Sequence, residues 1–319
     1  MGAQTDRTPS SHKDEDPQPV KFLEPFDDED GDIIIRSCDN MHFRVHKLIL
    51  KKASPVFDGM FMLPTGDDTD PVQTVPLEEG SITVARLLRL CYPFGSPQLG
   101  TLDDVSNLLN TCEKYQMHRL AEKLVSSELA KFVDTNPLRA YILACRANSL
   151  QEARRAAYRC LVLSLEDIIA SAEPEIRHLS ALAFKSLLLY YNQCRQAAAT
   201  VLSSCRFGWT STAYCWFNTY GHDLSCGDAC QQRFWYGEGL RCTVYPRRWW
   251  YDMMSPAVTH LLHEAPPLSP RLAETIPFPK NLPCNYCRTS SGDDLHRFFG
   301  LLEQEIQTQV KAVEFRLVA

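Results

Sequence analysis

The hydrophobic pattern near the start of the chain changes its period at about Val45, and this change constrains the fold more than any other feature. Before it, Ile33–Ile35 form a β-branched run that is typical of a buried strand, and turn-forming residues follow at 37–40. Phe43 and Val45 then alternate with polar residues, as on a half-buried strand. The stretch therefore predicts a β-hairpin that leads directly into a helix.

Helical spacing of apolar residues follows the hairpin. Lys51-Lys52 suit the last turn of one helix, and Ser54-Pro55 suit the cap and first residue of the next, so two short helices are expected to meet there. A third strand is expected at 72–77, and three helices after it reach about Phe132. This order predicts an α+β fold, a small sheet flanked by helices, of about a hundred residues.

The chain beyond Asn136-Pro137 is expected to be mainly α-helical. Helices are predicted over 138–147, 150–163 and 165–172, and a long one from Pro174 to about Leu202. No internal repeat of fixed period stands out, so a solenoid is not supported.

The last part of the chain differs in composition, because it holds all five tryptophans and two close pairs of cysteines. A proline-rich crossing segment is expected over 256–283, and apolar spacing from Leu295 to Val313 predicts an amphipathic C-terminal helix. The complete expected organisation is a disordered acidic and polar tail (1–27), the α+β domain (28–133), a helical region (134–203) and a Cys/Trp-rich extension that ends in the amphipathic helix (204–319).

Composition limits the classes of function. The formal net charge of −6 and the pI near 5.9 argue against nucleic acid as the main partner, because nonspecific binding to phosphates comes from clustered Lys and Arg. No apolar run of about eighteen residues and no secretory leader pattern occurs, so no membrane partner is expected. The 13 cysteines are then expected to be reduced thiols of an intracellular protein, in the cytoplasm or nucleus, where a cysteine cluster indicates a metal site rather than a disulfide frame.

Four stretches carry, in order, a resemblance to a known domain. They are "DGDIIIRSCDNMHFRVHKLIL", "SPVFDGMF", "LLRLCYPFG" and "DDVSNLLNTCEKYQMHRLAEKLV". Over about residues 28–133 the chain resembles a BTB/POZ domain, and its overall layout resembles fungal BTB proteins with a helical, Cys/Trp-rich C-terminal extension. The resemblance implies a protein–protein interaction module that pairs with itself or with another BTB protein and has no catalytic activity.

The resemblance also implies roles for single residues. In the family, the residues at the positions of Asp32 and Lys47 lie in a charged pocket near the dimer interface, and His46 matches a histidine that is part of the fold. Family members that act as substrate adaptors of cullin-based ubiquitin ligases usually carry an apolar residue, any residue and then Glu shortly after Met-Phe. This chain has Thr65-Gly66-Asp67 there and departs from that pattern, so a cullin scaffold is kept as an alternative partner.

His46 lies near Asp32, Asp39 and Lys47 in the sequence, which raises the question of chemistry. A catalytic or metal-binding role requires partners that converge on the imidazole, and these residues do not form a recognisable triad. We therefore interpret His46 as a capping or core histidine at a strand-to-helix junction. Asp32 and Lys47 could equally form an ordinary surface ion pair worth under about 1 kcal/mol.

The strongest chemical signal is two close cysteine pairs, Cys226-x3-Cys230 and Cys284-x2-Cys287. Each pair can supply two sulfurs from one tight turn, which suits a tetrahedral structural zinc ion. Further candidate ligands are Cys205, Cys215, His222 and Cys242. The alternative is a set of buried, reduced structural thiols. A nucleophile and base made of Cys226 and His222 is not favoured, because no orienting third group is evident.

The leading prediction is a non-enzymatic scaffold without a small-molecule substrate, in which dimerisation buries the apolar residues near 33–35 or on the first helix. The first alternative is a substrate adaptor of a cullin-based ubiquitin ligase. The second is a transcription regulator whose zinc-stabilised extension binds DNA. The candidate DNA contacts for that alternative are Arg241, Arg247 and Arg248, beside Trp249 and Trp250.

Overall fold

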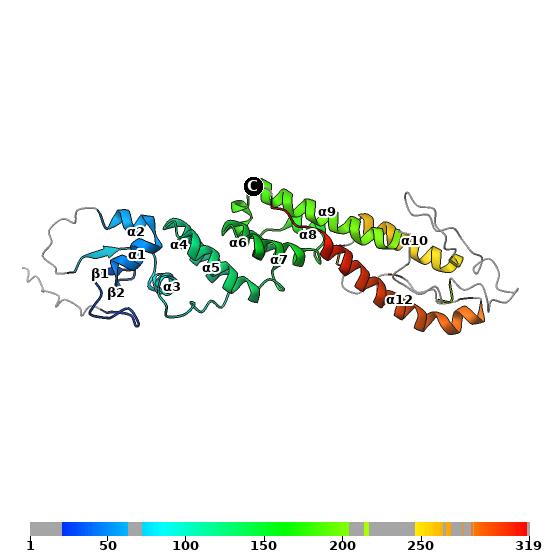
Figure 1. Ribbon diagram of the computed structural model, residues 1–319, viewed down its shortest axis with the longest axis horizontal. Coiled ribbons are helices and arrows are strands. Elements are labelled where there is room, and N and C mark those ends of the chain that lie inside the picture. Colours follow the sequence, from blue (N-terminus) through cyan, green and yellow to red (C-terminus); the bar gives the residue numbers. More distant parts are fainter. Residues whose placement is uncertain are drawn as a thin grey trace, which may run out of the picture. The chain divides into compact units, whose positions relative to one another are not determined.

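The structure is a computed structural model that divides into two compact units, Met1–Ala121 and Glu122–Ala319. It describes residues 21–62, 72–203, 214–216, 246–263, 266–268, 276, 282 and 284–317 (Figure 1). Residues 1–20 of the predicted disordered tail therefore lie outside the described residues. Each unit is described below by itself.

The N-terminal unit contains a three-stranded sheet in the order β2-β1-β3. β1 (Ile33–Arg36) pairs antiparallel with β2 (His42–Val45) and parallel with β3 (Thr74–Pro76). The predicted hairpin is therefore confirmed, and the alternation in β2 buries Phe43 and Val45 while its polar residues remain partly exposed. In β1, Ile33 and Ile35 are 0% exposed, so the isoleucine run belongs to the core of its own chain.

Two short helices follow the hairpin, α1 (Lys47–Ala53) and α2 (Pro55–Met60), as the sequence predicts. Ser54 caps α2: its Oγ accepts a hydrogen bond from the backbone N–H of Phe57 at 3.1 Å. The same hydroxyl donates to the carbonyl oxygen of Tyr115 at 2.6 Å, and the Tyr115 ring stacks on Phe57 with centroids 4.6 Å apart. One buried serine thus both starts a helix and links it to a distant part of the unit.

The remaining helices of this region are α3 (Ser81–Cys91), α4 (Leu102–Lys114) and the first residues of α5 (His118–Glu128). α3 begins after Gly80, which has no side chain to cap it; instead Asp39, on the hairpin turn, accepts from the Ser81 N–H at 2.9 Å. α4 is capped by its own Thr101. The predicted small sheet with flanking helices is confirmed.

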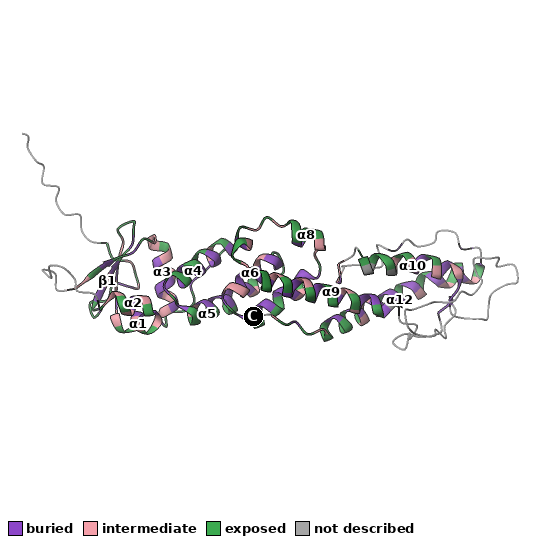
Figure 2. Ribbon diagram, turned by 90° about the horizontal axis from the view of Figure 1, so that it is seen from above, coloured by how far each residue is buried: buried purple, intermediate pink, exposed green. Residues whose placement is uncertain are grey.

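The secondary-structure elements that the structure describes in the C-terminal unit are all helices, which confirms the predicted mainly α-helical region. α9 packs against α7, α10 and α12. Buried residues recur along α12 at spacings of three and four, from Leu295 to Val310 (Figure 2), so the predicted amphipathic helix is present. After α5, its elements are η1 (Leu129–Lys131), α6 (Pro137–Arg146), α7 (Leu150–Cys160), α8 (Leu165–Ala170), η2 (Pro174–His178), α9 (Ala181–Ser203), α10 (Arg248–His263) and α12 (Asn285–Ala312).

The predicted long helix from Pro174 is wrong in one respect, because the chain breaks between η2 and α9. Ser180 provides the break: its Oγ accepts from the Ala183 N–H at 3.0 Å and so caps a new helix. η2 is held separately, since the buried Glu175 accepts two hydrogen bonds from the Arg139 Nε on α6, each of 3.0 Å. A local cap and a buried ion pair here outweigh the continuous apolar spacing.

Two boundaries in the last part of the chain also differ from the prediction. α10 includes Pro256, where a proline-rich crossing segment was expected to begin. Proline removes one backbone donor from a helix, but Pro256 is exposed, and the flanking aromatic and aliphatic residues bury the other side of α10. α12 begins at Asn285, well before Leu295. Among the helices that the structure describes, none is long and apolar enough to cross a membrane.

Candidate functional site

The junction between β2 and α1 brings together the residues that the sequence singles out. Asp32, just before β1, accepts a hydrogen bond from the backbone N–H of Lys47 through Oδ1 at 2.6 Å. Lys47 is the first residue of α1, whose cap residue His46 provides no side-chain cap. The Asp32 carboxylate therefore caps α1 from a neighbouring segment, where it also faces the positive end of the helix dipole.

His46 is held at this junction by Tyr92, the residue that follows α3. The Tyr92 hydroxyl accepts from the His46 backbone N–H at 2.8 Å and lies 3.1 Å from His46 Nδ1. On the other side of the ring, Nε2 lies 3.4 Å from the exposed carboxylate of Asp30. Burial raises the pKa of the Tyr92 hydroxyl, so that group remains protonated at neutral pH. These contacts orient the strand-to-helix junction, which suits the predicted structural role of His46.

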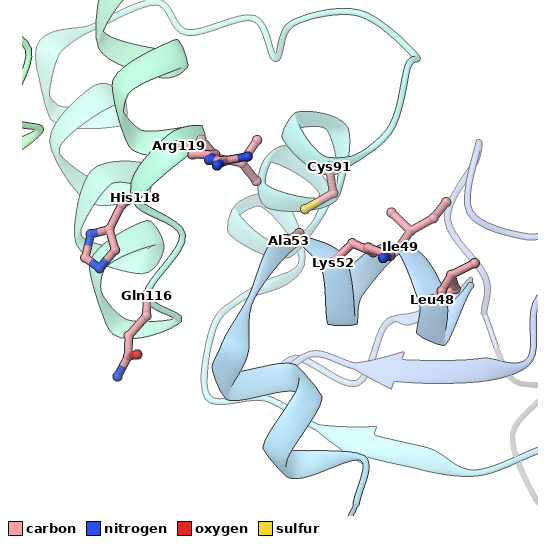
Figure 3. A pocket seen from close by; sticks show the side chains of 9 residues that line it. Leu48, Ile49, Lys52, Ala53, Cys91, Gln116, His118 and Arg119 are labelled. Atoms are coloured by element: carbon pink, nitrogen blue, oxygen red, sulfur yellow. The ribbon is translucent and has the colours of Figure 1, made fainter.

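A groove of about 700 Å³ opens beside α1 (Figure 3). Side chains of α1, the end of α3 and the start of α5 surround it. Its apolar lining comes from Leu48, Ile49, Ala53, Cys91 and Leu120, and its polar lining from Lys52, Gln116, His118 and Arg119. None of these described lining residues is acidic, so the groove combines an apolar wall with a cationic rim.

Leu48 is the most informative residue of this surface. The helical spacing of the sequence includes it among the apolar residues of the first helix, yet its side chain is 65% exposed. Leu50, two residues later, fills the core instead. A helix of this length buries one face only, and a second apolar residue on the outer face was the signal that could have indicated an interaction surface.

The same burial pattern narrows where a dimer can form. The sequence allowed either the residues near 33–35 or the first helix as the interface. Because Ile33 and Ile35 are already covered within their own chain, they have no surface left to bury against a partner. The exposed side of α1, with Leu48, still has apolar surface that a partner can cover.

The predicted metal ligands divide into two groups. Cys284 is the cap residue of α12 and Cys287 lies in its first turn, and both are buried. Cys226 and Cys230, the other predicted pair, lie outside the described residues, as do Cys205, His222 and Cys242. The residue that the structure brings to Cys287 is Cys215, and its side chain together with burial raises the pKa of the Cys287 thiol. All cysteines within the described residues are thiols.

Aromatic side chains surround these thiols. Trp216 stacks on Tyr214 at 4.7 Å and on Trp250 at 6.0 Å, and it meets Trp249 and Phe298 edge-on. These described tryptophans are core residues, each less than a tenth exposed.

The arginines proposed as DNA contacts are poorly placed for that role where they are described. Arg247 is 9% exposed. The guanidinium of Arg248 lies 3.4 Å from the carboxylate of Asp252 one turn along α10. Arg241 lies outside the described residues. Of the predicted DNA contacts, Arg247 is therefore nearly covered and Arg248 is compensated by an acid.

Comparison with known families gives one match. Residues 24–131, about a third of the chain, match the family model of the BTB/POZ domain. This confirms the resemblance for the N-terminal domain, and a BTB/POZ domain is a protein–protein interaction domain. No curated protein matches the chain.

Proposed function

We propose, from the match of residues 24–131 to the BTB/POZ domain, that this protein is a non-enzymatic interaction module that pairs with itself or with another BTB protein through the exposed side of α1. The observation that carries the proposal is Leu48, a large apolar side chain that is 65% exposed beside an apolar groove. Ile33 and Ile35 of the hairpin already occupy the core, whereas α1 still has apolar surface to bury beside the groove.

A two-fold dimer would use this surface twice. In an isologous interface the same patch on both chains is buried, so each contribution counts once per chain. Complete burial of one leucine side chain contributes about 1.5–3 kcal/mol, before the cost of association is subtracted. Leu48 alone therefore cannot hold a dimer. Leu48 and the groove beside it can together form the apolar centre of a dimer interface.

Asp32 and Lys47 border the same surface. The family places its charged pocket at these positions, near the dimer interface. Here the Asp32 carboxylate binds the Lys47 backbone, which leaves the Lys47 side chain to face a partner or solvent. We propose that Asp32 orients α1 and that the Lys47 ammonium supplies the charge of the interface.

The groove suits a segment of a partner protein. Its apolar wall fits an aliphatic or aromatic side chain, and its rim of Lys52 and Arg119 favours acidic residues beside that anchor. In this proposal the chain that fills the groove is the BTB partner itself, so the groove selects the chain with which α1 pairs.

The decisive measurement is the mass of the full-length protein in solution, by size-exclusion chromatography with light scattering over a wide concentration range. The wild type is expected to be a dimer, and Leu48→Asp is expected to be monomeric. Ile82→Asp is the matched control, because Ile82 on α3 is 66% exposed in the same unit but does not line the groove. A wild-type protein that stays monomeric at its highest concentration would overturn the proposal.

Two more specific functions remain proposals beside this one. A substrate adaptor of a cullin-based ubiquitin ligase would bind a purified cullin in a pull-down; its diagnostic residues, Thr65-Gly66-Asp67, lie outside the described residues. A transcription regulator with a zinc-stabilised extension would bind duplex DNA in a salt-dependent way, and the Cys284→Ser and Cys287→Ser changes would abolish that binding. The layout proposed for the whole chain is that of fungal BTB proteins with a helical, Cys/Trp-rich extension, acting in the cytoplasm or nucleus.

A further inference from the structure

The start of α1 lies against a strongly acidic segment. Residues 27–32 read Asp-Asp-Glu-Asp-Gly-Asp, and all five acidic residues among them are exposed. Two of the carboxylates are fixed to the helix start, because Asp30 lies 3.4 Å from Nε2 of His46 and Asp32 accepts from the Lys47 N–H. The acidic segment therefore belongs to the surface around the first turn of α1.

This segment keeps a negative charge in the folded unit. Two cations of the junction are close to it: Arg44 donates through Nε to the Gly31 carbonyl oxygen at 3.1 Å, and Lys47 is the first residue of α1. Among the described residues, the side chains of 27–29 form no ion pair with either cation or with any other. Five carboxylates and two cations leave a net negative charge at this end of the helix.

The other end of α1 is cationic. Lys52 is the residue before the helix end, and Arg119, at the start of α5, lines the same groove (Figure 3). Both residues are exposed, and no carboxylate of the described part of the chain pairs with them. Lys51, by contrast, pairs with Asp58 at 3.6 Å. Two positive charges at this end are thus left for a partner.

The apolar surface of α1 lies between the two charged ends. Leu48 is the second residue of the helix and is 65% exposed, and the groove beside it continues along Ile49 and Ala53 to Leu120. Figure 3 shows Leu48 at the end of the groove that lies farther from His118. Along a helix only about 10 Å long, the surface therefore changes from acidic through apolar to basic.

We propose that two copies of this chain pair with their α1 helices antiparallel, so that segment 27–32 of each copy faces Lys52 and Arg119 of the other. This inference rests on the proposed dimer through α1 and adds its direction and its charge contacts. A two-fold axis across the middle of the helix exchanges its ends, so an acidic end meets a basic end twice. An axis along the helix would instead place like charges together, which costs free energy.

The same axis suits the other side chains of α1. It brings Leu48 of one copy opposite Lys52 of the other, where the aliphatic stem of the lysine can cover the leucine while its ammonium reaches the acids. Lys47 then lies opposite the last turn of the second copy's α1, whose carbonyl oxygens carry a partial negative charge. This position agrees with the interface role proposed above for the Lys47 ammonium.

The test uses two charge-reversed variants of the full-length protein. The acid-end variant combines Glu29→Lys with Asp30→Lys, and the base-end variant combines Lys52→Glu with Arg119→Glu. Either variant alone places like charges at both contacts of an antiparallel pair. Each is therefore expected to have a dimer dissociation constant at least about tenfold above that of the wild type, measured by sedimentation equilibrium.

An equimolar mixture of the two variants is the decisive sample. In a dimer of one acid-end and one base-end variant, one contact keeps its wild-type charges and the other has both charges reversed, so attraction returns at both. The mixture is expected to form this heterodimer with about the wild-type affinity. Native mass spectrometry with a mass tag on one variant identifies it. A mixture that stays monomeric would overturn the antiparallel arrangement.

Lys21→Glu combined with Arg36→Glu is the matched control, because it also reverses two cations. Both residues are exposed and adjoin His42: the Lys21 carbonyl oxygen accepts from the His42 N–H, and Arg36 is the partner of His42 in the strand register. His42 begins β2, whereas α1 follows the other end of that strand. The control variant is expected to dimerise like the wild type.

The salt dependence of the wild-type dimer covers the case in which a variant fails to fold. Its dissociation constant is expected to rise severalfold between low and high sodium chloride, because salt screens exposed charge pairs. A wild-type dimer that is insensitive to salt, or charge variants that dimerise like the wild type, would overturn this inference and leave the proposed dimer intact. A wild-type protein that is monomeric at every concentration would overturn both.

Discussion

The two units of this protein are organised by different interactions. In the N-terminal unit, polar side chains reach across the fold to begin helices: Asp32 caps α1, Asp39 caps α3, and Ser54 caps α2 while it binds the carbonyl oxygen of Tyr115. In the C-terminal unit, large side chains from distant segments converge, with Trp216 in the centre of an aromatic cluster. Both units contain caps and packed rings, but hydrogen bonds across the fold to helix starts are prominent in the first unit, and the aromatic cluster around Trp216 is prominent in the second.

This difference predicts how each unit responds to substitution. Loss of a helix cap costs about 0.5–2 kcal/mol, because one or two backbone groups lose their partner. Loss of a buried aromatic ring costs about 3–5 kcal/mol, because a large cavity remains. The C-terminal unit should therefore be the more sensitive to single substitutions in its core.

The largest effect is expected for Trp216→Ala. Removal of this ring should lower the free energy of unfolding of the C-terminal unit by about 3–5 kcal/mol. All five tryptophans lie beyond residue 203, so tryptophan fluorescence during urea unfolding reports this unit alone. Phe57→Ala is the control, since Phe57 is equally buried in the N-terminal unit. If Phe57→Ala shifts the tryptophan transition as much as Trp216→Ala does, the two units do not unfold separately.

A comparable effect is expected for Arg139→Ala. Arg139 and Glu175 form a largely buried ion pair between α6 and η2, with side chains 13% and 6% exposed. Removal of the guanidinium leaves a buried carboxylate without its charge partner, which costs about 3–5 kcal/mol. The double variant Arg139→Met, Glu175→Leu removes both charges and should recover most of that loss. Urea unfolding of both proteins measures the difference; a double variant as unstable as the single one would contradict this account.

The sequence predicted the N-terminal unit well because its signals are local. The period of the apolar residues, the Ser54-Pro55 cap and the turn after β1 each lie within a few residues of the element they determine. The C-terminal unit was predicted only as helical. The break before α9 combines the local Ser180 cap with an ion pair between η2 and Arg139, which is far away in sequence, and α10 contains a proline that a local rule assigns to a loop.

The candidate sites show the same limit. The sequence identified Asp32, Lys47 and His46 as neighbours, but it could not show that Asp32 binds the Lys47 backbone rather than its ammonium group. It singled out Cys284 and Cys287 from their spacing and named Cys215 only among several further candidates, because tertiary packing is what places Cys215 beside Cys287. The groove was not foreseen, because its lining comes from three helices that are separate in sequence.

A smaller effect is expected for Asp32→Ala, which removes the cap of α1. The N-terminal unit should lose about 1 kcal/mol of stability. Asp32→Asn keeps an oxygen acceptor and should lose only a few tenths of that amount, so the pair separates capping from charge. Circular dichroism during thermal unfolding measures both. Equal losses in the two variants would show that the negative charge, not the hydrogen bond, is what α1 requires.

The smallest effect on stability is expected for Lys47→Met, and it is the sharpest test of how the N-terminal unit combines fold and function. The Asp32 carboxylate binds the Lys47 backbone N–H, which every non-proline residue retains, so the free energy of unfolding should change by less than about 0.5 kcal/mol. If the Lys47 ammonium belongs to the interface, the same variant should alter the dimer dissociation constant and its dependence on salt, because an interfacial charge acts through long-range electrostatics. Sedimentation equilibrium at low and high salt measures the dissociation constant and its salt dependence.

Lys51→Met on the same helix is the control, since Lys51 pairs with Asp58 of its own chain at 3.6 Å. An unchanged dissociation constant in Lys47→Met would mean that Asp32 and Lys47 serve the fold alone, and that α1 meets its partner through Leu48 and the groove.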